Sequence, residues 1–139
     1  MKARRVVPVL TGRGGMAALN PVWWWLAAAL YALGIFFFSA QSYPFGIRRL
    51  PFLVDKTVHL VVYGLFSTVL FVACRQSWPR TPSLLVSGLA LTLAVLYGIS
   101  DEYHQAFVPL RRIDGYDLAA DVVGAMLAQC AVWWAGHGH

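Results

Sequence analysis

The sequence predicts an all-α, polytopic membrane protein that folds as a four-helix transmembrane bundle. Hydrophobic residues make up 59% of the 139 residues and charged residues only 12%, whereas a soluble domain averages about 25% charged residues. The apolar residues form four stretches without Asp, Glu, Lys or Arg, at 14–47, 57–74, 81–100 and 122–139. Each stretch reaches the roughly 18 residues that mark a membrane-span candidate. A soluble helical protein would lack the polar surface to cover four of them.

We expect the helices at residues 21–40, 55–74, 83–103 and 117–134. Residues 1–20, which are basic and Gly-rich, are predicted to be a cytoplasmic tail. Residues 21–135 would form the membrane domain, and 136–139 a short C-terminal tail. The first apolar stretch is too long for the core of a signal peptide, so we expect it to remain as a membrane helix. Both cysteines, Cys74 and Cys130, lie in apolar stretches and are predicted to be packing residues.

The basic residues favour cytoplasmic N- and C-termini. Six Lys or Arg fall on the N-terminal side of the predicted bundle and five on the other side, but the dense basic group before the first helix usually dominates. In either orientation, an up-down bundle places Asp55, Asp101 and Asp117 at the same aqueous boundary. The formal charge of +5 is explained by membrane-flanking Lys and Arg. The chain has no basic stripe with interleaved aromatics, so nucleic acid is not an expected partner.

The chain has six carboxylate side chains. One is Asp55, and the other five lie between residues 101 and 121. Acids kept at helix ends near a bilayer usually carry function, because they are costly there. Asp55, His59 and Tyr63 are spaced i, i+4, i+8 and share one face of the second helix. Asp55 is expected to cap this helix. Lys56 is expected to anchor it by extending its ammonium group to the membrane surface.

Asp101, His104 and Gln105 share a face at the end of the third helix, and Glu102 points another way. Such a set suits a divalent cation, acid–base chemistry or a structural network. The spacing matches no metal-site signature. For acid–base chemistry, the catalytic candidates are His59, His104 and Asp101.

The loop after the third helix supplies Arg111 and Asp114, followed by Asp117 and Asp121 on one face of the fourth helix. Arginine suits bidentate pairing with a carboxylate or a phosphate. Arg111 therefore either pairs with an acid of the third or fourth helix or binds an anionic ligand. Gly124, three residues after Asp121, would allow close helix packing.

Two stretches resemble motifs of the VanZ-like membrane proteins. DKTVHLVVYGLF, from Asp55 to Phe66, resembles their D-K-x-x-H-x-x-x-Y-x-x-L motif. SDEYHQAFVPLRRIDGYDLAADVVG, from Ser100 to Gly124, resembles D-E-x-x-Q-x-F-x-P-G-R-x-x-D-x-x-D-x-x-x-N-x-x-G. Two positions depart from this pattern: Leu110 stands where the family has Gly, and Asp121 where Asn is common.

The resemblance implies a multi-span protein of the bacterial cytoplasmic (inner) membrane, with a link to resistance against the glycopeptide teicoplanin. The leading hypothesis is a cell-envelope protein that binds a membrane lipid or a lipid-linked envelope precursor by its head group. An intramembrane hydrolase or transferase and a purely structural polar network are the alternatives. The predicted pocket lies at the outer end of the bundle. Its residues are Asp55, His59, Tyr63, Asp101, Glu102, His104, Gln105, Arg111, Asp114, Asp117 and Asp121.

Overall fold

Four antiparallel helices form the part of the chain that the computed structural model describes, residues 20–42 and 50–137. They are α1 (Pro21–Ser39), α2 (Phe52–Ser77), α3 (Ser83–Gln105) and α4 (Gly115–His137). All four are long and apolar enough to cross a membrane, so the predicted all-α bundle of four membrane helices is confirmed. Of the predicted tails, residues 1–19, 138 and 139 lie outside the described residues, and residues 136 and 137 form the end of α4.

Prolines mark the starts of three helices. Pro21 occupies the first turn of α1, and Pro51 and Pro82 directly precede α2 and α3. Proline suits these positions because a first-turn N–H has no partner within the helix. Because α2 begins at Phe52, Asp55 lies inside its first turn, and the prediction that Asp55 caps the helix is wrong. A cap is formed at α4 instead, where Asp114 Oδ1 accepts a hydrogen bond from the Tyr116 backbone N–H at 2.9 Å.

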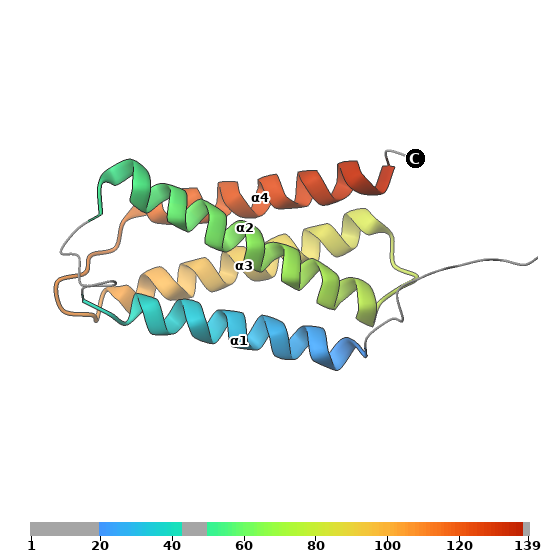
Figure 1. The fold of residues 1–139 in the computed structure, drawn as a ribbon, viewed down its shortest axis with the longest axis horizontal. Coiled ribbons are helices and arrows are strands. Elements are labelled where there is room, and N and C mark those ends of the chain that lie inside the picture. Colours follow the sequence, from blue (N-terminus) through green and yellow to red (C-terminus); the bar gives the residue numbers. More distant parts are fainter. Residues whose placement is uncertain (1–19, 43–49, 138–139) are drawn as a thin grey trace, which may run out of the picture.

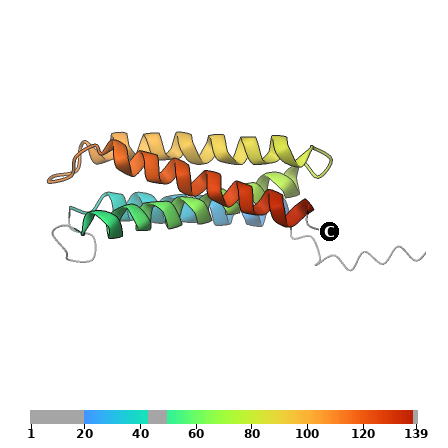
Figure 2. The same cartoon turned by 90° about the horizontal axis from the view of Figure 1, so that it is seen from above.

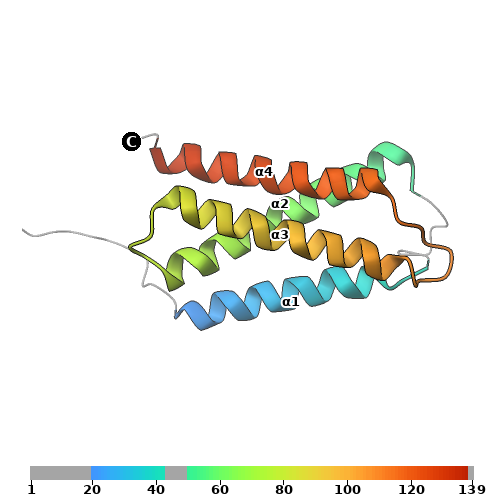
Figure 3. The ribbon, with the colours of Figure 1, turned by 180° about the vertical axis from the view of Figure 1, so that it is seen from behind.

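The helices α1 and α4 lie on opposite sides of the pair formed by α2 and α3 (Figures 1 and 3). Figure 2 shows the same bundle from above, with all four helices running along its long axis. The starts of α2 and α4 meet the ends of α1 and α3 at one end of the bundle, on the left in Figure 1. Asp55, Asp101 and Asp117 therefore lie at the same end, as predicted from the order of the helices.

The core consists of large side chains from α2 set against small ones from its neighbours. Tyr63, Phe66 and Leu70 of α2 are buried in this core. The other three helices contribute Ile35 and four small residues, Ala28, Ala90, Ala94 and Ala125. Large apolar side chains on the outside are strongly exposed, such as Leu84 on α3 at 72%. An apolar outer surface of this kind suits contact with lipid chains.

Two tyrosines attach α1 to the rest of the bundle. The Tyr31 hydroxyl donates to the Val62 carbonyl of α2 at 3.0 Å, and the Tyr97 hydroxyl of α3 donates to the Ala32 carbonyl at 2.6 Å. Because α1 buries few of its own residues, these bonds add specific contacts to its packing against α2 and α3.

The α2 and α4 helices pack most extensively, and glycine permits their close approach. A Cβ atom added to Gly124 would overlap the Leu60 backbone, and one added to Gly64 would lie 3.1 Å from the Gly124 carbonyl oxygen. Small residues let membrane helices approach at backbone distance. The packing role predicted for Gly124 is therefore confirmed.

We expect Gly124→Ala to lower the free energy of unfolding in detergent by about 1–3 kcal/mol, the usual range for overpacking. The added methyl group must push α4 away from the Leu60 backbone. Gly136→Ala, also on α4, is the matched control because its Cβ would meet nothing within 4 Å. Thermal unfolding of both variants measures the difference. Equal melting temperatures would contradict this account of α2–α4 packing.

Candidate functional site

Lys56 lies at the centre of the acidic residues. Its ammonium group contacts Asp55 at 3.1 Å, Asp114 at 2.7 Å, and Asp117, the closest of the three. Only 14% of the Lys56 side chain is exposed. The prediction of a surface anchor is therefore wrong: Lys56 turns inward and joins the first turn of α2 to the start of α4.

Asp114 is the most exposed member of this group. Donation from the Lys56 ammonium, aided by the Tyr116 backbone N–H, holds the pKa of the Asp114 carboxyl below its ordinary value. This stabilises the ionised form, so the Lys56–Asp114 pair persists at neutral pH. The pair ties the loop after α3 to α2.

His59 lies one turn deeper, between two acids of α4. Its Nδ1 is 2.9 Å from Asp121 Oδ1, and its Nε2 is 3.5 Å from Asp117 Oδ1. When Asp121 is ionised, its carboxylate only accepts hydrogen bonds, so His59 Nδ1 is the donor in this contact. Asp121 thereby fixes the orientation of the imidazole ring.

A second set of contacts joins α1, α3 and the loop after α3. Asp101 Oδ2 accepts hydrogen bonds from Ser39 at 2.8 Å and from Gln105 at 3.1 Å. Arg111 donates to Gln105 Oε1 at 3.5 Å and to the Gln41 carbonyl at 3.2 Å. Arg111 forms no ion pair with a carboxylate of the described residues, so the structural alternative proposed for it, pairing with an acid of the third or fourth helix, is wrong.

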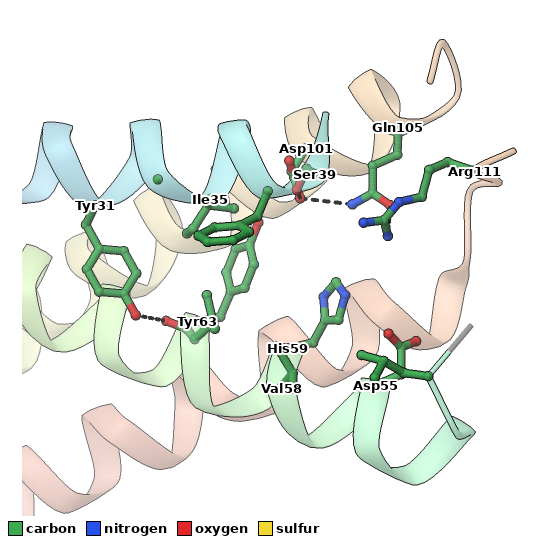
Figure 4. A pocket seen from close by; sticks show the side chains of 14 residues that line it. Tyr31, Ile35, Ser39, Asp55, Val58, His59, Tyr63, Asp101, Gln105 and Arg111 are labelled. Carbon is green, nitrogen blue, oxygen red and sulfur yellow. Dashed lines mark hydrogen bonds between the residues drawn. The ribbon is translucent and has the colours of Figure 1, made fainter. Parts of the chain in front are cut away.

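A cavity of about 370 Å³ lies between α1 and α2 and reaches α3 and Arg111. Tyr31, Ile35 and Val62 are among the residues that line its apolar part. Asp55, His59, Asp101, Gln105 and Arg111 gather at its other end, as Figure 4 shows. The pocket is therefore amphipathic, with a long apolar wall and a short polar end.

The predicted site residues divide into three groups. Asp55, His59, Tyr63, Asp101, Gln105 and Arg111 line the pocket. Behind them lie Glu102, Asp114, Asp117 and Asp121, which contact the lining residues or one another. His104 stands apart: its ring packs on Phe36 with centroids 4.5 Å apart, and it has no acid partner among the described residues.

Sequence reasoning missed Lys56 as a central residue and did not foresee the Ser39–Asp101 bond. The signal for Lys56 was available, because it directly follows Asp55 in the first turn of the helix that faces the acids of α4. A lone lysine near a membrane surface usually extends its ammonium group toward water, so an outward orientation was expected for Lys56. Ser39 offered no spacing signal, since its partner is 62 residues away.

Leu110 adopts a left-handed backbone conformation, with φ of 69°. This conformation is strained for a residue with a Cβ and natural for Gly. It explains why the family motif has Gly at this position, immediately before the arginine. This left-handed residue directly precedes Arg111, which lines the pocket.

Asp55, His59 and Asp117 each offer one ligand atom, and these atoms lie within 4.8 Å of one another. A metal ion would fit this spacing. The Lys56 ammonium already contacts two of the three residues and supplies positive charge at the same place.

These features define a class: a four-span membrane protein with a charged network and an amphipathic pocket at one end. The chain belongs to the VanZ/LLP1 family, whose sequence model matches residues 18–136. Both motifs lie within the matched range. No curated protein and no solved structure matches the chain.

We expect Lys56→Met to destabilise the folded protein by on the order of 2 kcal/mol, because it leaves three clustered carboxylates without their shared cation. The partial exposure of Asp55 and Asp114 keeps the effect below that of a fully buried pair. Arg80→Ala also removes one positive charge, but from an exposed position, and is the control. Thermal unfolding in detergent measures both.

A second change separates charge from packing. Adding Asp114→Asn to Lys56→Met removes one of the repelling carboxylates and should restore part of the lost stability. A double variant less stable than Lys56→Met would argue against repulsion as the cause.

Proposed function

We propose that this protein binds a membrane amphiphile in the pocket between α1 and α2, with the anionic head group at Arg111 and the hydrocarbon chain along the apolar wall. A membrane lipid or a lipid-linked envelope precursor has this chemistry. The observation that carries the proposal is the pairing of Arg111 at the polar end of the pocket with neutral groups, Gln41 and Gln105.

The contrast with Lys56 makes this observation specific. Three acids neutralise the Lys56 ammonium, so its charge is already compensated within the protein. Arg111 has no such partner among the described residues, and its guanidinium offers donors in the geometry that a phosphate accepts bidentately. An anion is therefore the complementary ligand for this end of the pocket.

The rest of the pocket suits a hydrocarbon chain. Its lining includes Tyr31, Gly34, Ile35, Phe38 and Val62. Its volume of about 370 Å³ falls within the ~300–1,000 Å³ of ligand pockets. That volume accommodates part of one chain, while the rest of the ligand would remain in the surrounding lipid.

We place the pocket at the outer face of a bacterial cytoplasmic membrane, with both termini in the cytoplasm. The basic residues before α1 support this orientation through the positive-inside rule. An outer-leaflet head group is the surface that a lipid-tailed glycopeptide such as teicoplanin would meet. Binding or shielding that head group would connect the pocket to the resistance associated with the name-giving VanZ protein.

One observation favours a second candidate, an intramembrane hydrolase or transferase. His59 lines the pocket and is oriented by Asp121 at 2.9 Å, as a general base is oriented by a carboxylate. Arg111 would then hold the anionic group of a substrate. His59 is a better base candidate than His104, which packs on Phe36 outside the pocket lining.

We expect Arg111→Ala to reduce the co-purification of one class of anionic lipid by about tenfold or more, since loss of a charge-assisted contact is worth about 1.5–3 kcal/mol. Mass spectrometry of lipids retained after mild detergent purification gives the measurement. Arg112→Ala is the matched control, because it removes the same charge from the exposed neighbouring position.

The same lipid profiles separate the two candidate functions. A binding protein retains an unmodified lipid, and His59→Ala produces no new lipid species. An enzyme converts its substrate, so His59→Ala causes the intact substrate to accumulate. Identical profiles for wild type, Arg111→Ala and Arg112→Ala would contradict a head group held by Arg111.

A further inference from the structure

Three buried carboxylates share one pattern. One oxygen of each is hydrogen-bonded, and the other has no partner among the described residues. Asp101 Oδ2 accepts from Ser39 and Gln105, Glu102 Oε2 accepts from the Asp114 backbone N–H at 2.9 Å, and Asp121 Oδ1 bonds to His59. The second oxygen of each accepts no hydrogen bond from the described residues, and all three are buried.

The Tyr63 hydroxyl is a fourth buried oxygen without a partner in this part of the structure. Exposure is 1% for Tyr63 and Asp121 and 4% for Asp101 and Glu102. Gly98 of α3 allows Tyr63 of α2 and Asp121 of α4 to pack closely against this helix. A Cβ at Gly98 would lie 3.3 Å from the Tyr63 ring and 3.4 Å from Asp121 Oδ2. Asp101 and Glu102 lie about one turn further along α3, at i+3 and i+4 from Gly98.

Among the described residues, no lysine or arginine forms an ion pair with these oxygens. Lys56 is bound to Asp55, Asp114 and Asp117. Among the ion pairs of residues 20–42 and 50–137, Asp101 and Glu102 take part in none, and Asp121 pairs with His59 alone. Buried acceptors within a membrane bundle are expensive unless a donor or a cation meets them.

The donor chemistry indicates which cation would fit. Carboxylate and phenol oxygens are hard ligands, which suit Mg²⁺, Mn²⁺ and Ca²⁺ better than zinc or copper. The hydrogen bonds to the opposite oxygens orient each carboxylate, as outer-shell bonds orient the ligands in metal sites.

The spacing of these oxygens does not let one small ion bind all three carboxylates directly, so waters would have to complete its coordination. Among the described residues, the donor atoms within 4.8 Å of one another belong to Asp55, His59 and Asp117, so the oxygens of Asp101, Glu102 and Asp121 are more widely spaced. Mg²⁺ typically keeps several waters and uses one or two protein carboxylates. We propose that Asp101, Glu102, Asp121 and Tyr63 bind a hydrated divalent cation of the Mg²⁺ class, next to the amphipathic pocket, which Asp101 and Tyr63 also line. This proposal does not depend on the head-group hypothesis.

A Mn²⁺ titration of the full chain, freed of metal with EDTA and held in phosphatidylcholine nanodiscs, tests the proposal. Electron paramagnetic resonance reports Mn²⁺ binding. We expect one Mn²⁺ per chain, displaced by excess Mg²⁺. Glu102→Gln and Asp121→Asn should each raise the dissociation constant by about tenfold to a hundredfold.

A pair of glycine variants controls for general effects of mutation. Gly98→Ala places a methyl group beside Asp121 and Tyr63 and should weaken Mn²⁺ binding. Gly88→Ala, on the same helix, meets nothing within 4 Å and should leave binding unchanged. Circular dichroism confirms that both variants are folded before titration.

Two results would overturn the proposal. Absence of Mn²⁺ binding to the wild-type chain would show that protons or water satisfy the buried oxygens. Binding that survives Glu102→Gln and Asp121→Asn but is lost in Asp55→Asn would place the ion at Asp55, His59 and Asp117 instead. Neither result bears on lipid retention by Arg111, so the two proposals fail separately.

Discussion

The contact between the Lys56 ammonium and the carboxylates of Asp55, Asp114 and Asp117 determines how one end of this bundle is built. Carboxylates near hydrocarbon repel one another and are poorly solvated. A shared cation lets the start of α2, the loop after α3 and the start of α4 converge. Because Lys56 is paired with these three acids, Arg111 remains available at the polar end of the pocket.

This ionic contact depends in turn on the backbone distance between α2 and α4. Gly124 permits the approach, because any side chain there would overlap the Leu60 backbone. His59 lies one residue before Leu60, and Asp121 lies one turn before Gly124. The close crossing therefore sets the 2.9 Å contact between His59 and Asp121. The α1 helix is held by fewer contacts, and the amphipathic pocket lies between it and α2.

The order and length of the apolar stretches were enough to predict the four helices and the common end of Asp55, Asp101 and Asp117. Helical spacing also predicted that Asp101 and Gln105 share a face, and they are hydrogen-bonded. Spacing within one helix could not decide contacts between helices. Lys56 was expected to extend toward the membrane surface, and Arg111 was given an acid as one alternative partner, because the choice between them depends on how α4 rotates against α2. Leu itself gives no signal for the left-handed turn at position 110; the Gly of the family pattern at this position is the one indication of it.

The central claim, that the space between α1 and α2 holds the chain of an anionic amphiphile, is tested most directly by photo-crosslinking. A phosphate-headed lipid with a photoreactive group in its chain would be activated in nanodiscs, and the labelled peptides mapped by mass spectrometry. We predict preferential labelling of pocket residues such as Tyr31, Phe38 and Val62 over the exposed Met126 and Leu127 of α4. The labelling should fall when unlabelled phosphate-headed lipid competes. Uniform labelling of all exposed helix faces, unaffected by competitor, would contradict the claim.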